Sequence, residues 1–207
     1  MTAQRPLLVV GDALLDRDVD GEATRLAPDA PAPVVDVTGD RSRPGGAGLA
    51  AALAARDGRE VTLVTALGRD PASEAVRAGL RPLVRLVELP LTGTLPVKTR
   101  IRAGGRPLVR VDRGGGTPGR PGSAVLDALR AAPAVLVADY GRGTAAAVRP
   151  WLAEAARRGT VVWDPHPRGV EPVAGARLAT PNAAEAARHG PSGQDGPPPG
   201  DDSLRAH

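Results

Sequence analysis

Two aspartates near the N-terminus are the first residues whose type and position could do chemistry. Asp12 lies just after the apolar run of residues 7–10, which predicts a buried strand, and Asp16 follows four residues later. In open α/β sheets, ligands bind at the carboxyl ends of the strands, where carboxylates can accept hydrogen bonds from the hydroxyl groups of a polyol. It is equally consistent with the pattern that Asp12 caps a turn and that Asp16 is solvated.

A glycine pair precedes the next element. Gly45 and Gly46 lead into an alanine-rich stretch that predicts a helix over residues 46–56. Glycines at a helix start leave backbone N–H groups open to an oxygen-rich or anionic ligand. The segment lacks the Gly-Lys-Ser/Thr ending of a Walker loop, and a simple turn explains it as well.

Cations and a further carboxylate occupy two later positions. Lys98 and Arg100 lie two residues apart on a predicted strand, so their side chains share a face and suit a phosphate, unless that face is merely solvated. Asp139 and Arg142 follow the predicted strand at residues 134–138, the same strand-end position as Asp12.

A candidate metal site comes last in the chain. Asn182 and Glu185 stand one helical turn apart at the start of a predicted helix, where they could hold a hydrated Mg²⁺, although capping by Thr180 or Asn182 explains the pattern equally well. The histidines show no ligand spacing, and there is no cysteine, so a zinc site is not expected.

The elements that must position these residues alternate between short apolar runs and alanine-rich stretches, which predicts an α/β fold with a parallel sheet. Asp70 and Pro71 mark the start of the second helix, and Gly79 its end. The predicted strands are residues 7–10, 61–65, 134–138 and 161–163, and the predicted helices are residues 46–56, 71–79, 123–131 and 144–158.

Two regions interrupt this alternation. Residues 17–37 and 84–112 contain prolines and glycines between short extended segments, which predicts β-rich excursions that form a flap over the sheet end, or else surface loops. We expect one α/β domain over residues 1–190 and a disordered proline-glycine tail over residues 191–207.

Composition excludes several classes of function. The 207-residue chain has no cysteine, so disulfides and cysteine nucleophiles are excluded. Its pI near 10.7 comes from arginine, since Lys98 is the only lysine and the formal net charge is only +4. The arginines alternate with acidic residues and aromatic residues are scarce, so we expect no nucleic-acid binding. No apolar run is long enough for a membrane span, and we expect a cytoplasmic protein.

The order of the motifs resembles that of the ribokinase (PfkB) superfamily, and within it the heptose 7-phosphate kinases. The motifs are Val-Gly-Asp with Leu-Asp (residues 10–16), Arg-Pro-Gly-Gly-Ala (43–47), Lys-Thr-Arg (98–100), Val-Arg-Val-Asp (109–112), Ala-Asp-Tyr-Gly-Arg-Gly (138–143), Asp-Pro (164–165) and Thr-Pro-Asn-x-x-Glu (180–185). The resemblance implies a ribokinase-like three-layer α/β/α sandwich with a small β flap. It also implies transfer of the ATP γ-phosphoryl group to a sugar hydroxyl, which in the heptose enzymes is O1 of heptose 7-phosphate on the route to ADP-heptose.

The same resemblance implies roles for individual residues. The positions of Asp12, Asp16, Gly45 and Gly46 line the sugar pocket, and those of Lys98 and Arg100 lie near the substrate. Asp139 and Arg142 match the phosphoryl-transfer path, and Asn182 and Glu185 match a motif that organises Mg²⁺ and the nucleotide. Dimerisation through the flap and a fused or separate adenylyltransferase are further implied partners.

Three departures from the family pattern bear on activity. Leu49 stands where the family has a sugar-binding asparagine, and Arg142 and His166 replace family lysines. No Gly-Ala-Gly-Asp motif, which would supply the general base, follows Glu185. We therefore expect a kinase fold incomplete at its C-terminus and negligible turnover by residues 1–207 alone. The alternatives are a non-catalytic protein that binds a sugar phosphate or a partner, and a kinase for another sugar.

Overall fold

The central sheet forms from short segments that are apolar on both faces. In the computed structural model, which describes residues 5–183 and 186, these segments pair in parallel in the order β4-β1-β7-β8-β9. Val9 and Val10 in the middle strand are fully buried, as expected where helices cover both faces. The strands are β1 (Leu7–Gly11), β4 (Val61–Leu67), β7 (Ala134–Ala138), β8 (Thr160–Asp164) and β9 (Leu178–Ala179).

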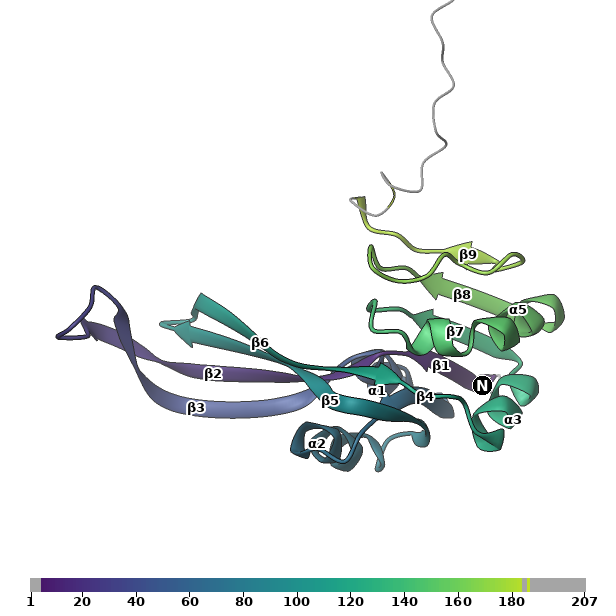
Figure 1. The fold of residues 1–207 in the computed structure, drawn as a ribbon, viewed down its shortest axis with the longest axis horizontal. Helices are drawn as coiled ribbons and strands as arrows, with labels where there is room; N and C mark the ends of the chain where they lie inside the picture. The colour runs from purple at the N-terminus through teal and green to yellow at the C-terminus, as the bar shows by residue number, and fades with distance from the viewer. Residues whose placement is uncertain (1–4, 184–185, 187–207) are drawn as a thin grey trace, which may run out of the picture.

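Helices cover both faces of this sheet (Figure 1). On one face, α1 (Ala47–Arg56) and α2 (Pro71–Leu80) bury their apolar residues against the strands. On the other face lie α3 (Ser123–Ala131), α4 (Thr144–Ala147) and α5 (Arg149–Arg158). The two clusters of buried residues make the three-layer α/β/α sandwich that the sequence predicts. None of the helices in the described part of the chain is both long and apolar enough to cross a membrane.

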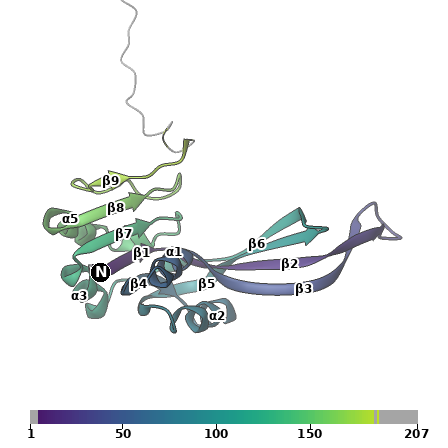
Figure 2. The same cartoon turned by 180° about the vertical axis from the view of Figure 1, so that it is seen from behind.

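A long β blade projects from the sandwich, as both views show (Figures 1 and 2). It consists of the hairpin β2 (Ala13–Leu26) and β3 (Pro33–Gly46) and the hairpin β5 (Arg85–Ala103) and β6 (Arg106–Pro118), joined by parallel pairing of β2 with β5. We call this blade, in the strand order β3-β2-β5-β6, the lid. The β-rich excursions predicted at residues 17–37 and 84–112 lie within it.

Strand β5 joins the lid to the sandwich. Its first part pairs with β4 up to Pro90, and its second part pairs with β2 from Val97 onward. The prediction of separate short segments broken by Pro90, Gly93 and Pro96 was wrong, since β5 is one continuous strand. The two prolines stand where the missing N–H removes no hydrogen bond between paired strands. Pro90 stands at the last pair with β4, and Pro96 lies in the register shift between Thr94 and Val97.

Local signals placed most helix ends correctly. Asp70 accepts hydrogen bonds from the N–H groups of Ala72 and Ser73 and so caps α2, as predicted. The predicted end at Gly79 was wrong, since α2 continues through Leu80, which is fully buried. The predicted helix over residues 144–158 is divided at Val148 into α4 and α5. Residues 191–207 lie outside the described residues.

Candidate functional site

One face of the lid carries an ordered set of charged side chains. Residues paired across β2 and β5 put Asp16 opposite Lys98, Asp18 opposite Arg100 and Asp20 opposite Arg102. Because paired residues point to the same side of a sheet, these side chains share a face with their partners on β3 and β6. We call this the charged face; its residues are Asp16, Asp18, Asp20, Arg41, Arg43, Lys98, Arg100, Arg102, Arg110 and Asp112.

The carboxylates on β2 are each held by arginines from neighbouring strands. Arg100 donates to Asp16 at 2.7 Å, and Arg43 pairs with Asp18, which lowers the pKa of that carboxyl through the hydrogen bond. Asp20 is within 3.3 Å of both Arg41 and Arg102. These ion pairs hold the carboxylates of the lid in position.

Asp16 occupies the part of this face nearest the sandwich. It is buried, and a Cβ at Gly45 would overlap its carboxylate, so glycine is required at that place. Gly46 has φ of +58° and lies against the backbone carbonyl of Asp12 and the ring of Tyr140. The structure therefore brings Asp16, Gly45 and Gly46 together, and their role in sugar binding stays a prediction. The first N–H of α1, that of Ala47, is already used by the Asp12 carbonyl.

Lys98 connects the lid with the loop that follows β7. Its Nζ lies 5.9 Å from the centre of the Tyr140 ring. Burial lowers the pKa of Lys98, and the nearby cations Arg110 and Arg142 lower it further, against the opposing effect of Asp16 and Asp112. Lys98 of the lid thus lies over Tyr140, which belongs to the same loop of the sandwich as Arg142.

Asp12 has a different environment from Asp16. It is 3% exposed, and its carboxylate accepts hydrogen bonds from the backbone N–H groups of Tyr140 at 3.2 Å and of Arg142 and Thr144 at 2.9 Å each. Two of the donors belong to the loop between β7 and α4, and the third, Thr144, is the first residue of α4. That Asp12 binds sugar hydroxyls stays a prediction, but the described contacts are all internal to the protein.

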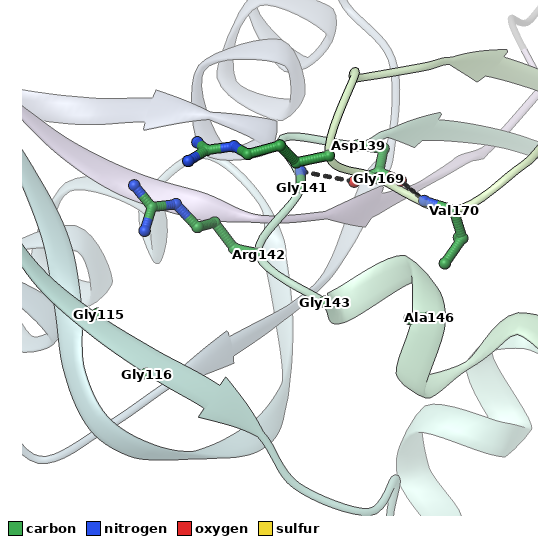
Figure 3. A pocket seen from close by; sticks show the side chains of 10 residues that line it. Gly115, Gly116, Asp139, Gly141, Arg142, Gly143, Ala146, Gly169 and Val170 are labelled. Atoms are coloured by element: carbon green, nitrogen blue, oxygen red, sulfur yellow. Dashed lines mark hydrogen bonds between the residues drawn. The ribbon is translucent and has the colours of Figure 1, made fainter.

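A glycine-rich cleft lies beside this loop (Figure 3). Its volume is about 370 Å³. The residues that line it come from β6, the β7–α4 loop and the segment after β8; they are Gly115, Gly116, Asp139, Gly141, Arg142, Gly143, Ala146, Arg168, Gly169 and Val170. Two guanidinium groups and many glycines, which allow close approach to backbone, suit an anionic ligand such as a phosphoryl group.

Asp139 joins the two loops at the rim of the cleft. Its carboxylate accepts the N–H groups of Gly141 at 2.8 Å and Val170 at 3.1 Å, drawn as dashed lines in Figure 3. Burial raises the pKa of Asp139, and the nearby Asp12 carboxylate adds to this effect. Gly169 packs so closely on the carboxylate that a Cβ there would overlap it.

Known proteins resemble this chain over most of its length. It is 58% identical over 205 residues to the bifunctional protein HldE of Streptomyces coelicolor, covering 99% of this chain and 43% of that protein. It is 38% identical over 187 residues to the bifunctional protein HldE of Nitrosococcus oceani, covering 86% of this chain and 39% of that protein. The chain thus spans about two fifths of the length of these curated relatives. No model of a protein family matches it.

Solved structures show the same fold at lower identity. A ribokinase of Arabidopsis thaliana in complex with ribose and ATP superimposes with a TM-score of 0.62 at 20% identity, covering 89% of this chain and 62% of that one. The tetrameric inhibited form of phosphofructokinase-2 from Escherichia coli gives a TM-score of 0.60 at 15% identity, covering 88% and 62%.

The chain is thus similar in sequence to bifunctional HldE proteins, and it has the fold of ribokinase and phosphofructokinase-2. Its lid, the strand-end aspartates and the glycine pair occupy one continuous region, at the carboxyl ends of the parallel strands, where open α/β folds bind ligands. Asp12, Asp16, the glycine pair, Lys98 and Arg142 lie in this region, and that they bind a substrate stays a prediction.

The predicted magnesium motif is only partly within the described residues. Asn182 is exposed and does not line the glycine-rich cleft, and its carbonyl accepts the N–H of Ala186 at 2.8 Å. Glu185 lies outside the described residues. Within residues 5–183 and 186, no group of three or more acidic or histidine side chains could hold a metal ion. The hydroxyl of Thr180 donates to Asp164 at 3.3 Å.

Several residues of the site escaped the sequence reasoning. The lining residues Gly115, Gly116, Arg168 and Gly169 were not singled out, and Tyr140 was noted only as part of a motif. The run Gly114-Gly115-Gly116 was a usable signal, because consecutive glycines often mark a close approach of backbone. Arg168 carried no signal, since one arginine among many is uninformative.

Proposed function

We propose that this chain is the sugar-phosphate-binding part of an ATP-dependent carbohydrate kinase that phosphorylates D-glycero-D-manno-heptose 7-phosphate at O1. The observation that carries the proposal is that Lys98 on the lid lies over Tyr140, in the same loop as Arg142, which lines the glycine-rich cleft. The similarity to two proteins named HldE supports heptose as the sugar.

The charge of the lid supports a phosphorylated substrate over a neutral sugar. On the charged face, Arg110 and Asp112 pair with each other at 3.0 Å. The remaining side chains are five cations, on β3 and β5, against three carboxylates, on β2. The formal excess of two positive charges would balance the two negative charges of a fully ionised phosphate monoester.

Each part of the site has a separate task in this proposal. Asp16 accepts hydrogen bonds from sugar hydroxyls, with Arg100 keeping its carboxylate in place. Lys98 binds the phosphate already on the sugar, and Arg142, in the loop that faces Lys98, adds its charge to this binding. Arg142 and Arg168 in the cleft neutralise the charge of the phosphoryl group in transit, since positioning and charge neutralisation account for most of the catalysis of phosphoryl transfer.

ATP supplies the γ-phosphoryl group when it is bound. The two arginines of the cleft fit its terminal phosphate. Among the described residues, the acidic and histidine side chains form no group of three or more that could hold a metal ion. We therefore assign the Mg²⁺ role to Asn182 and Glu185 as part of the proposal, on the family motif alone. An ATP-dependent reaction on a sugar phosphate fits the cytoplasm, and the name of the HldE relatives fits an adenylyltransferase fused to the kinase or acting after it.

A coupled ATP-consumption assay tests the proposal. Because no Gly-Ala-Gly-Asp motif is present in residues 1–207, we expect negligible turnover of heptose 7-phosphate by these residues alone, and turnover when a segment carrying that motif is joined or added. Robust turnover by residues 1–207 would contradict the assignment of the base to that motif. No turnover with the motif present would contradict the kinase proposal.

Two alternatives are separated by simple observations. A panel of heptose 7-phosphate, fructose 6-phosphate and ribose in the same assay identifies the sugar, and preference for ribose would contradict the role given to the charged face. For a non-catalytic binding protein, sugar phosphate would bind without turnover even when the motif is supplied. Coding sequence beyond His207 that continues with Gly-Ala-Gly-Asp would favour the kinase.

A further inference from the structure

Asp12 is the buried acid that links three separate parts of the fold. It lies between β1 and β2, its backbone carbonyl accepts the N–H of Ala47 at the start of α1, and its carboxylate reaches across to the loop before α4. That loop is more than 125 residues away in sequence, since the three bonds span 128 to 132 residues. Its position is thus set by tertiary contacts with Asp12.

The Asp12 carboxylate has little capacity left for a ligand. Oδ2 accepts the N–H groups of Tyr140 and Arg142, and Oδ1 accepts that of Thr144. A carboxylate offers about four lone-pair directions, of which three are in use, and the residue is 3% exposed. Asp16, the other strand-end acid, receives a side-chain donor, Arg100, at the edge of the charged face. The two acids therefore differ in what they can do.

We propose that Asp12 is a positioning residue: it clamps the 139–144 loop through its backbone and thereby fixes Arg142 at the junction of the lid and the glycine-rich cleft, without contacting the sugar. The inference deepens the proposed function, and it rests on that function only where sugar-phosphate binding is measured.

The geometry explains why the clamp acts on Arg142 in particular. Its neighbours Gly141 and Gly143 have φ of +68° and +102°, conformations that leave the backbone of this loop without regular pairing. The Arg142 N–H donates to Asp12, and the Arg142 side chain extends away from α4 (Figure 3). The positive charge of Arg142 is one of the causes that lower the pKa of Lys98. Release of the N–H would free the guanidinium to move.

The first test is amide exchange in the wild type and in Asp12→Asn, a variant of the same shape that replaces one acceptor oxygen by an NH₂ group. We expect exchange in the peptide covering residues 139–147 to become about 10- to 100-fold faster, the effect of losing charge-assisted bonds. Asp16→Asn is the matched control and leaves that peptide unchanged. Unchanged exchange in Asp12→Asn overturns the proposal.

The second test is a double-mutant cycle on heptose 7-phosphate affinity, measured by calorimetry. If Asp12 acts through Arg142, then Asp12→Asn weakens binding by the wild type but changes binding by Arg142→Ala by less than about twofold, because the residue it positions is gone. Asp16→Asn weakens both backgrounds by the same factor. Equal weakening of both backgrounds by Asp12→Asn overturns the proposal and makes Asp12 a direct ligand.

Amide exchange also tests the role of Asp12 if the wild type does not bind the sugar phosphate or if Asp12→Asn does not fold. If the wild type does not bind heptose 7-phosphate, the proposed function fails, and amide exchange alone decides the role of Asp12. If Asp12→Asn does not fold, exchange in the wild type decides it: the amides of Tyr140, Arg142 and Thr144 must exchange as slowly as those of β7. Exchange at the rate of unprotected amides overturns the clamp.

Discussion

Lys98 makes the site sensitive to pH. Burial lowers its pKa below the ordinary value of 10.5, so the ammonium loses its proton at a lower pH than an exposed lysine does. The charge that attracts a phosphate is present below this shifted pKa and lost as the pH rises through it. A sugar phosphate stays doubly ionised over the same range.

We therefore predict that affinity for heptose 7-phosphate falls about tenfold on the alkaline side, before pH 10.5 is reached, as a charge-assisted bond worth roughly 1.5 kcal/mol or more is lost. Calorimetric titrations at a series of pH values measure this. Lys98→Arg keeps the charge and is expected to flatten the profile. The same fall in Lys98→Arg would show that another group titrates.

Gly45 has a more demanding position than its neighbours on β3. An added Cβ would overlap Oδ2 of Asp16 and lie 2.5 Å from Cδ1 of Leu14. Gly45→Ala is expected to cost about 1–3 kcal/mol of unfolding free energy, through overpacking, and to weaken sugar binding by moving Asp16. Gly39→Ala, on the same strand, meets only one atom, at 3.9 Å, and serves as the control in urea denaturation. Equal stability of the two variants would contradict the crowding around Asp16.

Several candidate residues of this site could be recognised in the sequence from their type and spacing. The others lie at the site only because of contacts between residues distant in sequence. The glycine pair and the cation pair were recognisable because glycine and same-face spacing have local causes. The partners of Asp12 were not, because three backbone donors more than 125 residues away leave no local pattern. Arg168 likewise enters the cleft only through the fold.

At the scale of elements, Asp70 connects a helix to the strand that carries the lid. Besides capping α2, its carboxylate accepts the hydroxyl of Ser73 at 2.7 Å and the N–H of Leu95 at 3.2 Å. Leu95 lies in the irregular stretch where β5 passes from the sandwich into the lid. The cap therefore also holds the base of the lid.

Asp70→Ala is expected to lower the unfolding free energy by about 1–2 kcal/mol, the usual cost of losing an N-cap, with the Leu95 N–H left unpaired as well. Asp127→Ala is the control, because that side chain is 71% exposed and its pairing with Arg130 is weak. Chemical denaturation compares the two. A change below about 0.5 kcal/mol in Asp70→Ala would contradict the link between α2 and the lid.

The bounds of the helices and strands could be predicted from hydrophobic periodicity and capping residues where a segment lies between clear turn residues. Strand β7 and helix α3 have the predicted bounds, since each is a clean run between turn residues. Strand β5 was misread because proline and glycine normally end a strand, and only the change of partner from β4 to β2 makes them acceptable. Such a change of partner has no signature in one sequence.

At the scale of the whole molecule, the lid carries a group of aliphatic side chains opposite the charged face, beside the Arg17–Asp40 ion pair. Ile101 pairs with Val19 on one side and Val109 on the other, Val111 pairs with Thr99, and Val37 lies opposite Gly21. Val109 is 49% and Val37 59% exposed, which is unusual for a group of aliphatic side chains on one surface. We propose that two copies of the chain associate through this face of the lid.

Sedimentation measurements test this association. We predict a dimer for the wild type and a monomer for Val109→Asp, which would bury a charge in the interface. Leu53 on α1 is similarly exposed but lies away from the lid, so Leu53→Asp is the control and is expected to stay dimeric. A monomeric wild type, or a dimer unaffected by Val109→Asp, would contradict the role of this face.

The account as a whole depends on a site built for a sugar that already carries a phosphate. The most direct measurement is the affinity of the 207-residue chain for heptose 7-phosphate compared with that for the same heptose without its phosphate, by calorimetry at low salt. We predict at least about tenfold tighter binding of the phosphorylated sugar, from one or more charge-assisted bonds with the excess cations of the charged face. Equal affinities for the two sugars would contradict the account.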